Sequence, residues 1–189
     1  MGVACLTISG YSQGLVQFAN FSGTGGGKVY SGTTNTLATG STTLELLYGP
    51  AGDTLAQLIA LGTGQVFTYN ISSTPSLQGE FFYGTVTTTQ PAGGGSADAT
   101  LNVELAIAGW TGGFANYAAA LAAGNAPSIG ITAAFGNPTG GGGSPPSTAA
   151  TLVDWTAANS LVLSSSPEPT TLALGGLGAA ALLMFRRRK

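Results

Sequence analysis

The sequence contains no histidine and only one cysteine, Cys5. Without histidine the chain cannot build a Ser-His-Asp or Cys-His nucleophilic centre, nor a metal site with imidazole ligands. With one cysteine it can form neither an internal disulfide nor a cysteine-rich zinc site. We therefore expect no cofactor and no bound metal, and we expect Cys5 to be a small buried hydrophobic residue.

Charged side chains are also scarce, at 6% of the 189 residues, whereas soluble domains carry about 25%. Before position 167 the only basic residue is Lys28, and six acids give this part a net charge of −5. Such a surface cannot neutralise clustered phosphates, which argues against nucleic-acid binding. Solubility depends instead on glycine and on neutral polar residues, a composition that favours strands joined by turns.

Up to about residue 165, short apolar or β-branched runs alternate with turn clusters. The runs predict strands at 3–9, 15–21, 29–30, 43–48, 65–72, 80–89, 100–110, 129–135, 150–155 and 160–164. The run 55–61 is ambiguous between strand and helix, and the alanine-rich run 114–123 is the one short helix that we expect. This pattern, without an internal repeat, predicts an all-β domain over residues 1–163. We expect an antiparallel, jelly-roll-like β-sandwich, with a flattened barrel as the alternative.

The character of the sequence changes at residue 164. A serine spacer leads to Pro167, Glu168 and Pro169, residues 170–185 carry no charge, and the basic cluster Arg186, Arg187, Arg188 and Lys189 follows. Sixteen helical residues span about 24 Å, which crosses a bilayer with help from snorkelling flanks. The basic cluster should stay on the cytoplasmic side, so the body lies outside the cytoplasm. The prolines keep the chain extended at the membrane surface.

These three parts, in this order, resemble the PEP-CTERM sorting domain, a tail that also goes under the name ice-binding protein C-terminal domain. The resemblance covers residues 167–189 and says nothing of what the body binds. It implies that an exosortase-type membrane enzyme processes the protein and recognises Pro167, Glu168 and Pro169. A plain membrane anchor that is never cleaved is the alternative, and a helix buried in the fold is a remoter one.

Export also requires a signal peptide, and residues 1–10 lack the basic and long apolar regions of one. We expect the true start to lie upstream of Met1; loss of the export signal is the alternative.

No motif in the body predicts catalysis. The run 23–28 lacks the first glycine and the hydroxyl residue of a phosphate-binding loop. We expect the glutamates at 45, 80 and 104 to lie on solvated strand faces, although two converging carboxylates would allow glycoside hydrolysis. Trp110 is expected in the core rather than in a sugar-stacking site. Calcium at the aspartates 53, 98 or 154 is a minor alternative.

Two further polar features have simple interpretations. The threonine row at 85, 87 and 89 is expected to be an ordinary polar strand face, with ice or sugar binding as a minor alternative. Asn70-Ile71-Ser72 matches a glycosylation pattern, which we interpret as coincidence.

The sequence therefore predicts a noncatalytic protein of the cell surface or extracellular matrix, structural or adhesive in biofilm and in contact with exopolysaccharide. A carbohydrate-binding module is the first alternative. A carboxylate-dependent glycoside hydrolase is the second.

Overall fold

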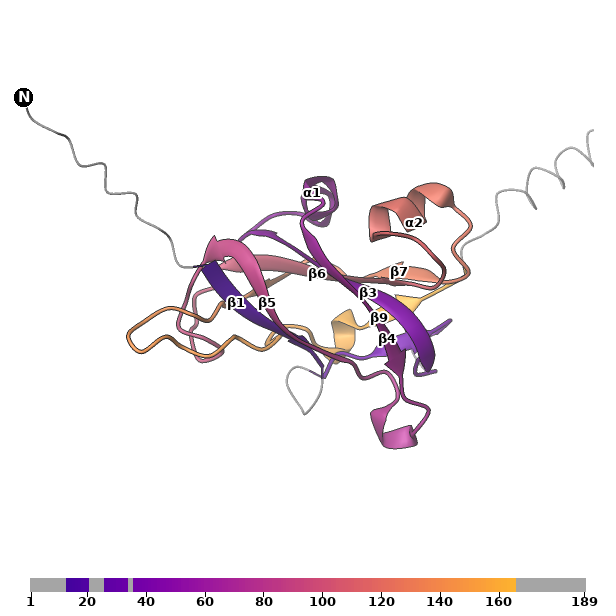
Figure 1. The fold of residues 1–189 in the computed structure, drawn as a ribbon, viewed down its shortest axis with the longest axis horizontal. Coiled ribbons are helices and arrows are strands. Elements are labelled where there is room, and N and C mark those ends of the chain that lie inside the picture. The colour runs from indigo at the N-terminus through magenta and orange to yellow at the C-terminus, as the bar shows by residue number, and fades with distance from the viewer. Residues whose placement is uncertain (1–12, 21–25, 34–35, 166–189) are drawn as a thin grey trace, which may run out of the picture.

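In the computed structural model, which describes residues 13–20, 26–33 and 36–165, the centre of the fold is a five-stranded sheet. Its path runs through β4 (Gly64–Ile71), β3 (Gly40–Pro50), β6 (Val103–Trp110) and β7 (Ile129–Ile131), and β8 (Phe135–Asn137) also pairs with β6. All these pairings are antiparallel. Strand β3 pairs along most of its length with β4 on one side and with β6 on the other, and β6 also pairs with β7 and β8. Strands β3 and β6 therefore lie at the centre of the sheet (Figure 1).

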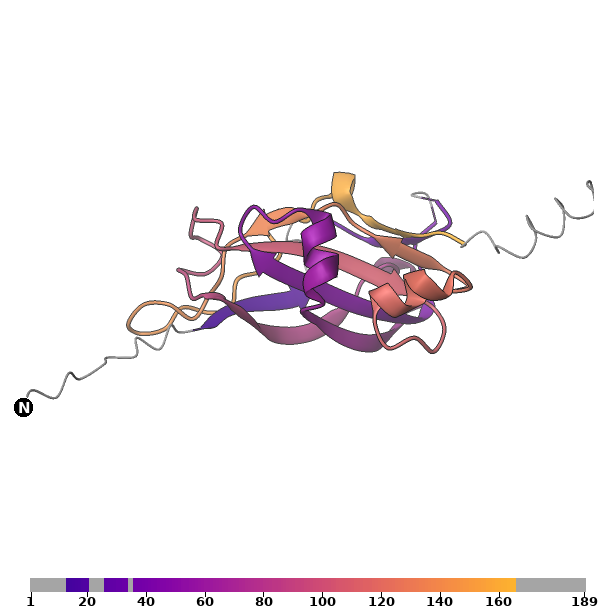
Figure 2. The same cartoon turned by 90° about the horizontal axis from the view of Figure 1, so that it is seen from above.

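Two short helices cover one face of this sheet, as Figures 1 and 2 show from two sides. Helix α1 (Leu55–Leu61) begins at a capping box formed by Thr54 and Gln57, and it ends at Gly62 in the left-handed conformation. Helix α2 (Tyr117–Ala123) is capped by the Asn116 side chain. The helices and the sheet bury a smaller core between them, which includes Leu47, Leu58, Ala106, Ala108, Trp110, Tyr117 and Ala120.

The opposite face of the sheet packs against two separate strand pairs. The first is the antiparallel pair of β1 (Gln13–Ala19) and β5 (Phe82–Pro91). The second is the parallel pair of β2 (Val29–Ser31) and β9 (Leu161–Leu163). Short 3-10 turns at Pro75–Leu77 and Ala157–Asn159 lie in the connections.

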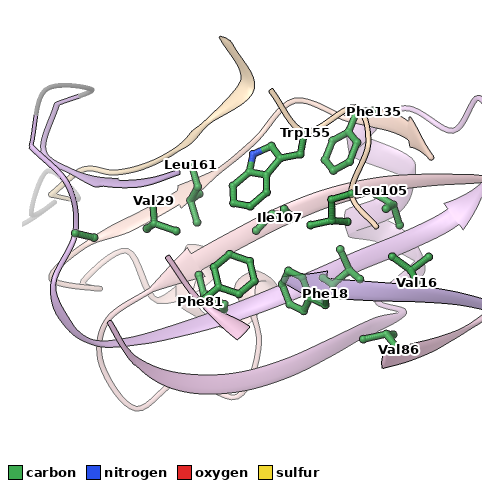
Figure 3. Packing of buried hydrophobic residues seen from close by; sticks show 14 of the residues in the cluster. Val16, Phe18, Val29, Phe81, Val86, Leu105, Ile107, Phe135, Trp155 and Leu161 are labelled. Atoms are coloured by element: carbon green, nitrogen blue, oxygen red, sulfur yellow. The ribbon is translucent and has the colours of Figure 1, made fainter. Parts of the chain in front are cut away.

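The main hydrophobic core lies between the central sheet and these two pairs (Figure 3). Phe18 and Phe81 meet edge to face with ring centroids 4.9 Å apart, and Phe81 in turn contacts Trp155 at 5.7 Å. The Trp155 indole nitrogen donates to the Asn159 carbonyl oxygen at 2.7 Å, so that its polar atom is satisfied inside the core. Buried side chains come from β1, β2, β3, β4, β5, β6, β8 and β9, which joins the layers into one domain.

The all-β class with antiparallel sheets is confirmed, with three differences in detail. The described residues contain two α-helices rather than one, and the expected helix at 114–123 begins at Tyr117. The pair β2–β9 is parallel. The prediction of a strand at 150–155 is wrong, because this segment is irregular. The side chain of Asn137 donates to the Thr151 carbonyl oxygen and accepts from the Val153 amide, both at 2.9 Å. These bonds take the place of a strand ladder.

Candidate functional site

The sorting residues that the sequence predicts, from Pro167 to Lys189, and the predicted membrane helix at 170–185 lie outside the described residues. The structure does describe where the body reaches them. Ser164 exchanges two main-chain hydrogen bonds with Ile129, at 2.9 and 3.1 Å, and Ser165 is exposed. This end of the body lies opposite the end at which β1 begins (Figures 1 and 2). The proline motif therefore begins three residues after Ser164, which makes the last described main-chain hydrogen bonds to the sheet.

Glu45 is the most unusual acid of the body, because it is only 3% exposed. The prediction of a solvated position is wrong for this residue. Its Oε2 accepts a hydrogen bond of 2.7 Å from the main-chain N–H of Tyr117, the first residue of α2. Burial raises the pKa of the Glu45 carboxyl above its ordinary value of 4.5, and the Tyr117 hydrogen bond opposes that shift. A cavity of about 20 Å³ between the helices touches Glu45, which is room for about one water molecule.

The other two glutamates do not converge with Glu45. Glu104 faces the same side of the sheet, but the strand register separates it from the position opposite Glu45 by four residues. That separation corresponds to about 13 Å along the strand, longer than the roughly 5–9.5 Å between glycosidase carboxylates. The Glu104 side chain instead accepts a hydrogen bond from the Gly52 amide at 3.0 Å, and Glu80 pairs with Lys28.

The Asp98 carboxylate has local structural partners as well. Asp98 accepts hydrogen bonds of 2.9 Å from the amides of Gly94 and Thr100, and these bonds hold the pKa of its carboxyl below the usual range. Among residues 13–20, 26–33 and 36–165, no group of three or more acidic, cysteine or histidine side chains is arranged to hold a metal ion.

Both tryptophans are core residues, as expected for Trp110. Trp110 is fully buried under α2, and Trp155 is 1% exposed. The larger aromatic side chains that do reach the surface are Phe82 and Tyr83 on β5, at 50% and 38% exposure. Tyr83 contacts Phe67 of β4 at a centroid distance of 4.8 Å, with the rings tilted by 45°. The tilt means that these rings do not form a flat stacking platform.

An open groove of about 550 Å³ lies where the chain enters β3 and leaves β4. It is lined by Thr39, Gly40, Asn70, Ile71, Ser72 and Ser73, none of which carries a charge. Its volume is in the range of small-molecule sites, but its lining is more polar than is usual for them. No local sequence pattern predicts this groove, apart from the polar residues beside Asn70 in the run that matches a glycosylation pattern.

The threonine row forms the outward face of β5, as expected. Thr85, Thr87 and Thr89 are exposed, whereas Val86 and Thr88 between them are buried. The row lies on β5, whose register with β1 shifts at two places.

The described part of the chain also includes no helix that is both long and apolar enough to cross a membrane.

Comparison with known proteins adds one finding about the tail. The family model of the PEP-CTERM protein-sorting motif matches residues 167–189. No curated protein and no solved structure matches the chain. The match therefore covers the same 23 residues whose order and chemistry carry the resemblance in the sequence, and it does not extend to the body.

Proposed function

We propose that this chain is an exported surface protein, because its residues 167–189 are a PEP-CTERM protein-sorting motif. The apolar span 170–185 is retained in the bilayer as the chain is exported, and the basic cluster at 186–189 stays on the cytoplasmic side. The motif of Pro167, Glu168 and Pro169 then lies at the outer surface of the cytoplasmic membrane, where an exosortase-type enzyme recognises it. The single observation that carries this proposal is the match of the motif at 167–189.

The attachment of the tail to the body supports the same proposal. The last described hydrogen bonds of the sheet are those of Ser164, and the motif begins at residue 167. Among the described residues, the ladder at this edge is complete by Ser164, two residues before the chain enters the part that the structure does not describe. Its exit at one end of the molecule lets the body project away from the membrane surface (Figure 1).

For the body we propose a noncatalytic β-sandwich, in which the central sheet forms one layer and the pairs β1–β5 and β2–β9 form the other. The acids support a noncatalytic role, because Glu45 and Asp98 accept hydrogen bonds from main-chain amides and Glu80 forms an ion pair with Lys28. Carboxylates with structural partners at these separations are not arranged as an acid and a nucleophile.

We propose a structural or adhesive role in extracellular matrix or biofilm, with exopolysaccharide as a partner. The uncharged groove beside Asn70 favours a neutral, hydroxyl-rich ligand, and it also keeps the carbohydrate-binding module as the second candidate. Retardation of the protein in gels that contain neutral exopolysaccharide separates the two. Retardation that Asn70→Ala reduces supports a binding module, and retardation that Asn70→Ala leaves unchanged supports a matrix protein that contacts the polysaccharide elsewhere on its surface. Migration unchanged by the polysaccharide would contradict exopolysaccharide as a partner.

The sorting proposal is tested by expressing the chain behind an export signal in two otherwise identical hosts, with and without an exosortase. The intact mass of the protein should show loss of the basic cluster 186–189 only in the host that has the enzyme. Glu168→Ala should prevent this loss, because it removes the charge between the two prolines, whereas Thr170→Ala should not. The same mass in both hosts would contradict the proposal and would support a permanent anchor.

A further inference from the structure

Strand β4 forms an edge of the central sheet, and the phase of its hydrogen bonds can be determined. The Tyr48 amide donates to the Thr63 carbonyl oxygen at 3.3 Å, immediately beyond the pair Leu47–Gly64. Hydrogen-bonded and non-bonded pairs alternate in an antiparallel ladder. The main chains of Gln65, Phe67, Tyr69 and Ile71 therefore face β3, and those of Gly64, Val66, Thr68 and Asn70 face away from it.

The other side of the sheet gives the same phase independently. The Thr132 amide donates to the Ile107 carbonyl oxygen at 2.9 Å, so the main chain of Ile107 faces β7. The main chains of its neighbours on β6, Ala106 and Ala108, therefore face β3 and pair with Leu47 and Glu45. The alternate β3 residues, Leu46 and Leu44, then face β4, where they pair with Gln65 and Phe67. The carbonyl of Val66 accepts the side-chain amide of Gln65 at 3.2 Å, as expected for an oxygen that points away from β3.

Within the part of the chain that the structure describes, no other hydrogen bond reaches the outward main-chain groups of β4. The edge offers a donor and an acceptor at every second residue over the length of the strand, which is the arrangement that an added strand requires.

The side chains of β4 lack the features that normally protect an edge. The strand Gly64–Ile71 has no charged residue and no proline, and it consists mainly of β-branched, aromatic and amide side chains. Its register with β3 runs without a bulge from one end to the other. Self-pairing brings identical residues close together, so a neutral strand avoids the repulsion that a charged one would create.

We propose that β4 pairs antiparallel with β4 of a second copy of this chain. In the register centred on Phe67, Gly64 lies opposite Asn70 of the other copy and Val66 lies opposite Thr68. All four outward residues then form hydrogen-bonded pairs, and the two central sheets join into one. This two-fold arrangement uses the same surface on both copies, and the bond from Gln65 to Val66 is replaced by a main-chain bond.

Two proline variants test the pairing, because each removes one outward amide hydrogen without touching the ladder inside the sheet. Thr68→Pro removes the donor at the proposed interface; Thr68 is exposed, and proline is tolerated at an edge where the N–H faces solvent. Thr87→Pro is the matched control on β5. The amides of Leu15 and Gln17 donate to the carbonyls of Gly140 and Ala150, so the main chains of these two β1 residues face away from β5. Thr87 lies opposite Leu15, so its own amide also faces away from the β1–β5 ladder.

The full chain is purified in detergent and its mass is measured by sedimentation, with circular dichroism as the check on folding. The wild type and Thr87→Pro should sediment as dimers, with twice the 18.6 kDa mass of one chain. Thr68→Pro should sediment as a monomer, with the mass of one chain. Hydrogen exchange at Val66, Thr68 and Asn70 should be slow in the dimer, and at Val66 and Asn70 fast in Thr68→Pro.

Three outcomes would overturn the inference. They are a monomeric wild type, a dimer that survives Thr68→Pro, and loss of the dimer in both proline variants. The second outcome would place self-association in the tail or on another face. The measurement uses purified protein, so its failure would leave the sorting proposal unaffected.

Discussion

The two edges of the central sheet are completed differently. At the β7 edge, Ile129 and Ser164 exchange two main-chain hydrogen bonds, which bring β9 alongside the sheet. Gly130 approaches the Val162 main chain so closely that a Cβ at this position would lie 2.0 Å from the Val162 carbonyl oxygen. At the β4 edge, the outward amides and carbonyls within the described ranges have only the Gln65 side chain as a partner.

The difference assigns separate tasks to the two edges. The closed edge contains the last described strand before the sorting motif, and its described ladder bonds end at Ser164, ahead of the motif at 167–189. The open edge begins at Gly64, and no other described strand pairs with it. The proposed processing at the tail and the proposed self-association at β4 would therefore not compete for the same residues.

The largest effect is expected from breaking the closed edge with Gly130→Ala. The new methyl group would collide with the Val162 main chain, which cannot move aside as a flexible side chain could. Overpacking of this kind costs about 2–3 kcal/mol of unfolding free energy, measured by urea denaturation. Gly113→Ala is the matched control, since nothing lies within 4 Å of its Cβ position. Equal stability of the two variants would show that β9 is not held closely against β7.

A smaller effect, dependent on pH, is expected at Glu45, which lies opposite Val66 of the open-edge strand. Because burial raises the pKa of Glu45, the folded protein binds this proton more tightly than the unfolded chain does. The stability that the protonated carboxyl contributes is complete below the unfolded pKa of about 4.5 and is lost as pH rises through the folded pKa.

Glu45→Gln stays neutral throughout this range. The variant should therefore match the wild type at the acid end and should become the more stable protein as pH approaches neutrality. Chemical denaturation at a series of pH values measures the difference, and Glu104→Gln controls for the same chemical change at a half-buried site on the same face. A wild type that gains stability relative to Glu45→Gln with rising pH would contradict the assignment.

The sequence predicted most of the strands, because alternation alone marks a half-buried strand. In the strand predicted at 15–21, Val16 and Phe18 are two residues apart, so they lie on the same face of the strand, and both are fully buried. Helix α1 was ambiguous from its apolar run, although the capping box of Thr54 and Gln57 was present in the sequence as a start signal.

Other features depend on residues that are distant in the chain, and local patterns do not reveal them. Burial of Glu45 depends on α2, whose first residue is 72 positions away and supplies the amide that binds the carboxylate. The irregular course of 150–155 depends on Asn137. The groove at Asn70 forms where the start of β3 lies beside the end of β4, which is distant in the chain. By contrast, the sorting motif is contiguous, so its order and chemistry were sufficient to identify it.

The most direct test of the central claim is the position of the body relative to the cytoplasmic membrane before processing. The chain, fused to an export signal, is expressed in a host without exosortase, and protease is added to intact spheroplasts. The account predicts that the body is digested from outside while a membrane fragment ending in Arg186, Arg187, Arg188 and Lys189 is protected. A body that remains intact until the membrane is broken would contradict it.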